Sequence, residues 1–227
     1  MFKKAFTLAE ILITLGIIGV VAAMTMPVLI ENYKKKQTVT QLKKIYSALQ
    51  QSIQLSQNNY GDICNWDWGL TSEDFFKRYL SSNFSVLKNC GNGEGCWNTD
   101  GGFQLNGNKY SEAPSFTSNG LASKLSLMDG TFVALIKQDN NHIHIHVDLN
   151  GDKRPNVYGK DIFVMTLTSK DFSDGIHNIP VAGLYMYGHG ITRDRVISAG
   201  CAKNRTGFTC GELILMDSWD IKNDYPW

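Results

Sequence analysis

The sequence predicts an α+β protein in which one long N-terminal helix packs, through its second half, against an antiparallel β-sheet head. Two observations predict the helix. Residues 6–30 form an apolar run whose one charge is Glu10, and the stretch from about Glu31 to Gln57 repeats apolar residues at three- and four-residue steps without Gly or Pro. One observation predicts the sheet: short alternating segments separated by Asx-Gly turns follow Asn58.

The segment from Ile11 to Ile30 contains no charged residue. A membrane-spanning helix needs about 20 apolar residues, so this segment is long enough to cross a bilayer. It fits a secretory signal peptide, with small residues at Val21-Ala22-Ala23 for cleavage, and it also fits a simple membrane anchor.

Two features favour a third interpretation, in which the helix stays in the mature protein and takes part in its function. Glu10 lies near the start of the apolar run, where an unpaired carboxylate is costly and is therefore usually functional. The apolar run also continues without a break into an amphipathic stripe. Its members are Val39, Leu42, Tyr46, Leu49 and Ile53. The two halves together predict a rod of roughly 70 Å at about 1.5 Å per residue, and a head must cover the stripe.

The segment Lys3-Lys4-Ala5-Phe6-Thr7-Leu8-Ala9-Glu10-Ile11-Leu12 resembles the processing and methylation motif of type IV prepilins and type II secretion pseudopilins. The resemblance implies cleavage between Ala5 and Phe6 by a prepilin peptidase, followed by N-methylation of Phe6. The family usually has Gly where this chain has Ala5. The implied organisation is a leader over 1–5, a transmembrane and filament-core helix over 6–30, an amphipathic half over 31–57 and an exported head over 58–227.

The resemblance also implies a role for Glu10 in assembly. Cleavage creates a cationic amine at Phe6, and Glu10 of one subunit would neutralise the Phe6 amine of a neighbour in an apolar filament core, where such a pair is strong. The pair would set the axial register. The alternative is that Glu10 reaches the cytoplasmic headgroups of the membrane. Within the helix, Gly16, Gly19 and Pro27 predict local flexibility or a small-residue packing face.

The expected partners are other pilin-like subunits, the inner membrane and the prepilin peptidase and methylase. The net charge of +1 argues against nucleic-acid binding, and no catalytic activity is expected. The expected location is the inner membrane, crossed once with the head outside the cytoplasm, and then a periplasmic or cell-surface filament.

Five cysteines at short spacings favour disulfide loops in an oxidising compartment over a metal site. Cys90–Cys96 and Cys201–Cys210 are the natural local pairs, which leaves Cys64. Either one thiol is free, one bond joins two molecules, or one of these pairings is wrong.

The head sequence predicts a short helix and then a meander of strands. Thr71 or Ser72 is expected to cap the helix, which runs to about Leu80. The expected strands are Phe103–Leu105 and Lys109–Ser111 around an Asn106-Gly107 turn, Lys124–Leu127 and Thr131–Lys137 around Asp129-Gly130, then His142–Asp148, Ile162–Thr168 and Val181–Tyr187. A last helix or strand is expected over Glu212–Trp219.

The segment that follows Asp148 supports two interpretations. Asp148, Asn150 and Asp152 alternate like the first ligands of a calcium loop, and Asp161 would replace the missing bidentate Glu. The alternative is a tight turn whose Asx side chains bond their own backbone.

His142, His144 and His146 share one face of a predicted strand. Alternate side chains on a strand lie about 7 Å apart, which is wide for three ligands on one ion, so we expect a polar sheet face more than a metal site. His177 and His189 accompany no nucleophile motif. The leading interpretation is a structural subunit of a pilus or secretion pseudopilus. The rival is an extracytoplasmic binding protein or enzyme, either anchored by this helix or secreted with it as a signal.

Overall fold

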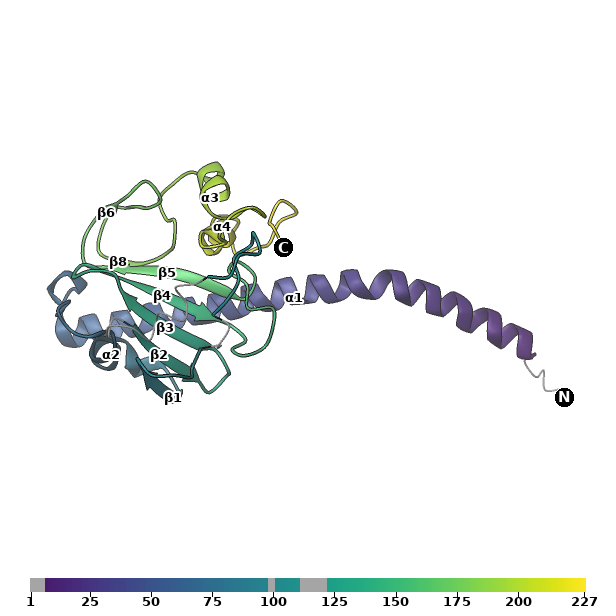
Figure 1. Ribbon diagram of the computed structural model, residues 1–227, viewed down its shortest axis with the longest axis horizontal. Helices are drawn as coiled ribbons and strands as arrows, with labels where there is room; N and C mark the ends of the chain where they lie inside the picture. The colour runs from purple at the N-terminus through teal and green to yellow at the C-terminus, as the bar shows by residue number, and fades with distance from the viewer. Residues whose placement is uncertain (1–6, 98–100, 111–121) are drawn as a thin grey trace. The chain divides into compact units, whose positions relative to one another are not determined.

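The computed structural model describes residues 7–97, 101–110 and 122–227. The chain forms two compact units, Met1–Gln37 and Thr38–Trp227. Helix α1 (Leu8–Tyr60) begins in the first unit and ends in the second. A six-stranded antiparallel sheet follows it, which confirms the predicted α+β class (Figure 1). The predicted cleavage site at Ala5 and Phe6 lies outside the described residues.

The first unit contains the apolar half of α1. Almost every side chain from Leu8 to Ile30 is exposed. The hydroxyls of Thr14 and Thr25 donate hydrogen bonds to the carbonyls of Glu10 and Val21, each at 2.9 Å, so their polarity is satisfied inside the helix. The helix continues through Pro27, which lacks the N–H that would bond the carbonyl four residues earlier.

The sheet of the second unit has the strand order β1-β2-β3-β4-β5-β8, and its paired neighbours run antiparallel. The strands are β1 (Val86–Gly91), β2 (Ala122–Leu127), β3 (Phe132–Lys137), β4 (His142–Asp148), β5 (Ile162–Thr168) and β8 (Gly183–Met186). The central strands match the predicted ones closely. The Asp129-Gly130 turn forms as expected, with Gly130 at φ +88°, a conformation that favours glycine.

The amphipathic stripe of α1 covers one face of this sheet (Figure 1). Leu42 and Leu49 are fully buried, Ile53 and Tyr46 are nearly so, and Val39 packs at the margin. They meet the alternate residues Ile143, Ile145 and Val147 of β4 in one hydrophobic core. The predicted stripe is therefore confirmed, and it fixes which face of each strand is apolar.

The opposite face of the sheet carries a second, smaller core. Trp97, Phe132, Tyr158 and Val164 are buried there beneath the connecting loops. His146 is 3% exposed on the same face. The face that carries the β4 histidines, which was expected to be polar, is thus covered in part by loops with aromatic side chains.

The remaining elements are short. They are α2 (Ser72–Phe75) and the wider helical turn η2 (Phe76–Leu80), the 3-10 turns η1 (Ile63–Asn65) and η3 (Ser81–Asn83), the hairpin strands β6 (Phe172–Ser173) and β7 (Asn178–Ile179), and the helices α3 (Arg193–Ala199) and α4 (Cys210–Met216). Thr71 caps α2, since its hydroxyl accepts from the Asp74 N–H at 3.1 Å.

Several predicted boundaries differ from the structure. The strands expected around Asn106-Gly107 reduce to a single bridge between Phe103 and Lys109, and Ser111 lies outside the described residues. Strand β1 was not predicted, because it is an irregular strand with two register shifts and little alternation of apolar residues.

Replacing Leu49 with Ala should lower the free energy of unfolding of the head by about 2–5 kcal/mol, because the cavity would lie between α1 and the sheet. Leu55 is the matched control on the same helix, since it is 43% exposed. Leu55→Ala should change stability by no more than about 0.5 kcal/mol. Urea unfolding of the full chain in detergent, followed by Trp fluorescence, measures both. Equal effects of the two substitutions would contradict the assigned packing.

Candidate functional site

The N-terminus of α1 is a capping box made by Thr7 and Glu10. Glu10 Oε2 accepts hydrogen bonds from the Thr7 N–H and the Thr7 hydroxyl, both at 2.8 Å. The Glu10 N–H in turn donates to Thr7 Oγ1 at 3.3 Å. The T-x-x-E spacing is the known signature of such a reciprocal cap.

This cap gives Glu10 a partner within its own chain. The position of Glu10 in the apolar run predicts an assembly role for its carboxylate, whereas the cap is signalled by the T-x-x-E spacing of Thr7-Leu8-Ala9-Glu10, which the prediction did not use. The hydrogen bonds that Thr7 donates in the cap engage Glu10 Oε2. Within residues 7–97, 101–110 and 122–227 no hydrogen bond reaches Oε1, and Thr7 and Glu10 are both exposed. A carboxylate held at a helix N-terminus in this way is oriented and ready to meet a cation.

The helix beyond this cap is long and apolar enough to cross a membrane. An 18-residue stretch of this helix has a mean hydropathy of 2.3, and none of its residues is buried. A Cβ added at Gly16 or Gly19 would meet no atom within 4 Å, so both glycines leave open surface on the helix. A secretory signal sequence would also have these properties, so the helix supports membrane insertion or export.

The disulfide predictions are confirmed. Cys90 bonds Cys96 and Cys201 bonds Cys210, and Cys64 is an exposed free thiol in the η1 turn. Two disulfides in one head are typical of an oxidising compartment. They support a location of the head outside the cytoplasm.

The Asp148–Asp161 loop is held by its own side chains. Asp148 Oδ1 accepts from the N–H groups of Asn150 and Gly151 at 3.1 and 3.0 Å. Asp161 accepts from the Asn156 and Val157 N–H groups at 2.8 and 2.6 Å. Asn150 connects the two aspartates, because its backbone N–H donates to Asp148 and its side-chain Nδ2 donates to Asp161 Oδ2 at 3.0 Å.

This geometry favours the turn interpretation of the loop over the calcium one. Asp148 and Asp161 are 0% and 5% exposed and face backbone donors, whereas Asp152 is exposed. Across residues 7–97, 101–110 and 122–227, no group of three His, Cys, Asp or Glu side chains is placed to hold a metal ion. Burial, and then the charge of Asp161, raises the pKa of Asp148 to about 8. Burial also raises the pKa of Asp161.

The histidines of β4 separate into two environments. His146 lies in the second core, where its Nδ1 is 2.9 Å from the Tyr158 hydroxyl, and burial lowers its pKa to about 3. His142 and His144 neighbour each other, with ring centroids 5.5 Å apart. The tertiary structure adds His177 to this pair: its ring centroid lies 6.4 Å from that of His144.

The other predicted residues have structural partners. His189 Nδ1 lies 3.0 Å from Oε1 of the buried Glu212. The pair's hydrogen bond raises the pKa of His189. Tyr225 is buried and its hydroxyl donates to the Gly159 carbonyl, so the C-terminal aromatic segment packs into the head.

Comparison with known families gives one match. The model of a family of unknown function, DUF6613, matches residues 28–90, which is less than half of the 227-residue chain. The matched region runs from the end of the apolar segment through the packed half of α1 to β1. No curated protein and no solved structure matches the chain.

Replacing Asp148 with Asn should stabilise the head at alkaline pH. The folded-state pKa of Asp148 is raised from 3.8 to about 8, so its contribution to stability is lost as the pH rises through that interval. Asn keeps the Oδ1 acceptor and carries no charge. The melting temperature of D148N should therefore exceed that of the wild type by about 3 °C or more at pH 8.5, and by less at pH 5.

The same melting experiment tests calcium. Added calcium should leave both melting temperatures unchanged if the loop is a turn. A calcium-dependent rise in the wild type that D148N lacks would instead identify a cation site.

Proposed function

We propose that this chain is a pilin-like structural subunit of a type IV pilus or of a type II secretion-like filament. The observation that carries the proposal is the continuity of α1, which presents an apolar, exposed half in one unit and packs a head on its other half. A signal peptide that is removed has no need to continue into a stripe that builds the core of the head. The subunit role is structural, with no catalysis and no nucleic acid required.

The proposed sequence of events follows from the chemistry of the N-terminus. The prepilin peptidase removes residues 1–5, which leaves a cationic amine on Phe6 for N-methylation. The subunit waits in the inner membrane with its head outside. Assembly then moves the apolar half of α1 from lipid into a core of similar helices. Glu10, oriented by Thr7, meets the Phe6 amine of a neighbouring subunit there and fixes the register.

A membrane-anchored binding protein is the second candidate, and one observation favours it. The carboxylate of Glu10 is already hydrogen-bonded by Thr7, so it has a role in an isolated helix with no neighbour. In that case the helix is an anchor alone, and the function of the protein lies in the head.

Intact-mass measurement of the protein from host membranes tests the processing step. We expect a chain that begins at N-methylated Phe6, and an unprocessed chain in cells without the prepilin peptidase. A chain that begins near Met24 in both strains would mean an ordinary signal peptide and would overturn the filament proposal.

Two substitutions separate the charge of Glu10 from its cap. Glu10→Gln keeps an acceptor that suits a capping box but removes the charge. Thr7→Ala removes the two hydrogen bonds of the cap that use the Thr7 hydroxyl and keeps the charge. If the charge pairs between subunits, E10Q should lower the amount of sheared filament at least about tenfold, the factor given by ~1.4 kcal/mol of lost pairing, while T7A assembles.

Immunoblots of sheared and membrane fractions measure both forms of the protein. Normal membrane levels in both variants establish that the head still folds and is exported. Filaments lost in T7A but kept in E10Q would show that the cap matters and that the intersubunit pair does not.

A further inference from the structure

The hairpin of β6 and β7 covers part of the outer face of the sheet. Its residues Phe172–Ile179 leave the sheet after β5 and return before β8. The backbone N–H of Asn178 donates to the His189 carbonyl at 2.8 Å and ties the hairpin to the segment after β8. The tip of the hairpin, around Asp174 and Gly175, is exposed. The hairpin therefore contacts the rest of the head through this backbone hydrogen bond and through the side chains on its inner side.

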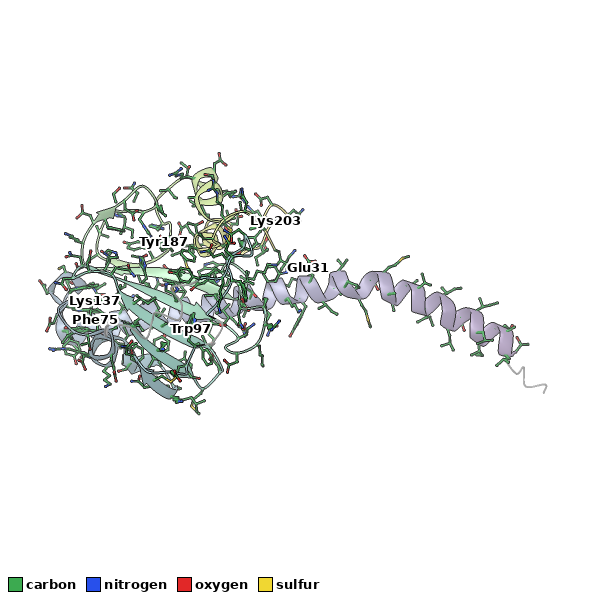
Figure 2. All side chains as sticks on the ribbon, viewed as in Figure 1. Glu31, Phe75, Trp97, Lys137, Tyr187 and Lys203 are labelled. Atoms are coloured by element: carbon green, nitrogen blue, oxygen red, sulfur yellow. A yellow bond between two sulfur atoms is a disulfide. The ribbon has the colours of Figure 1, made fainter. Side chains whose placement is uncertain are left out.

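The inner side of the hairpin packs against the rings of histidine and tyrosine side chains. Phe172 stacks on His142 with ring centroids 4.7 Å apart. His177 is 1% exposed, and its ring lies edge-on to that of Tyr187 with ring centroids 4.4 Å apart. The Nε2 atom of His177 is 3.4 Å from the Thr166 hydroxyl. Tyr187, labelled in Figure 2, also lies edge-on to His144, with ring centroids 5.3 Å apart.

His144 is the centre of this cluster. It lies between His142, at 5.5 Å, and His177, at 6.4 Å, measured between ring centroids. In the part of the chain that the structure describes, no carboxylate hydrogen-bonds to the His144 ring. A proton on His144 would therefore be placed in a largely apolar site between two other imidazoles.

Two carboxylates lie at the margins of the cluster. Asp139, in the β3–β4 turn, is 3.0 Å from His142 Nδ1, and Asp174, in the hairpin, is 3.1 Å from His177 Nδ1. Both carboxyls have pKa values below their usual range, because backbone N–H groups and the histidines outweigh their partial burial. Both carboxyls stay ionised at pH 5, and Asp174 partly offsets the effect of burial on the pKa of His177.

We propose that the β6–β7 hairpin is an acid-released flap, closed over the outer face of the sheet while His144 and His177 are neutral and opened when they gain protons. This inference goes beyond the proposed function and does not depend on filament assembly. It needs only a head that meets the pH outside the cytoplasm, as the disulfides indicate.

The direction of the effect follows from burial. Burial, and then the neighbouring His142 and His177, lower the pKa of His144 from 6.5 to about 3. Burial also lowers the pKa of His177, although Asp174 opposes this. The closed state thus keeps its full stability above pH 6.5 and loses it as the pH falls. Each such imidazole raises the ratio of open to closed flaps by up to about tenfold per pH unit.

Two other histidines must be separated from this effect. His189 faces Glu212 of α4, and the hydrogen bond between them raises the pKa of His189, so its protonation strengthens this pair. His146 is buried beside the second core, and burial lowers its pKa, so protonation of His146 in acid destabilises the whole head. Lys170 and Asp171 precede the hairpin and are exposed. A useful measurement must therefore resolve the flap from the rest of the head.

Hydrogen exchange read by mass spectrometry on the full chain in detergent provides that resolution. Protection factors for residues 172–179 and for β3 and β4 are compared at pH 7.5 and pH 5, after correction for the intrinsic pH dependence of exchange. We expect protection of the hairpin to fall by at least about tenfold at pH 5, while β3 and β4 stay protected.

Two substitutions assign the effect. His144→Phe keeps a ring of similar shape against Tyr187 and removes the titration, so the fall in hairpin protection should shrink strongly. His146→Phe, the matched control on the same strand and face, should leave the fall unchanged. His177→Gln gives a second route if H144F does not fold.

Three results would overturn the proposal. They are an unchanged hairpin at pH 5, a loss of protection spread evenly over the head, and equal acid responses in the wild type and in folded H144F or H177Q.

Discussion

The contact between the second half of α1 and the inner face of the sheet is the interaction on which the rest of the head depends. Leu42 and Leu49 are fully buried there, and polar groups reinforce the contact: the Tyr46 hydroxyl donates to the Leu184 carbonyl at 3.3 Å and the Thr38 hydroxyl to the Lys160 carbonyl at 3.4 Å. Without the helix, the strands would present a continuous apolar surface to water. One unbroken helix supplies both this contact and the apolar segment, so the apolar segment is joined directly to the element that builds the core of the head.

The outer face of the sheet imposes the second constraint. One side of the six-stranded sheet is covered by α1 together with the short helices α2 and α4. The other side is left to the loops, which are rich in Gly and Asx residues that bond their own backbone. Two disulfides close such segments and reduce the conformational entropy of the unfolded chain. The result is a core that buries imidazoles and carboxyls, among them His146 and Asp148, at 3% and 0% exposure. Burial of these groups makes the stability of the head depend on pH from both directions.

The Thr7–Glu10 cap connects the two proposed roles of the N-terminal helix. A carboxylate in a capping box stabilises the N-terminus of its own helix. A carboxylate at the start of an apolar segment can also pair with a cationic amine. The two uses are compatible, because the hydrogen bonds from Thr7 engage one oxygen, Oε2. The family match over residues 28–90 spans the transition from the apolar to the packed half of α1.

The sequence by itself determined the elements whose signal is periodic. Helix α1, its buried stripe, strands β2 to β5 and the two local disulfides were predicted from spacing alone, since burial of one face leaves a repeat of 3.6 or 2 residues in the chain. The tertiary structure decided what spacing does not encode. Strand β1 pairs through bulges, the outer sheet face is covered by distant loops, and His177 joins His144 from a hairpin 33 positions further along the chain. Such contacts depend on how loops close over the sheet, and a loop's path is set by packing against side chains remote in sequence.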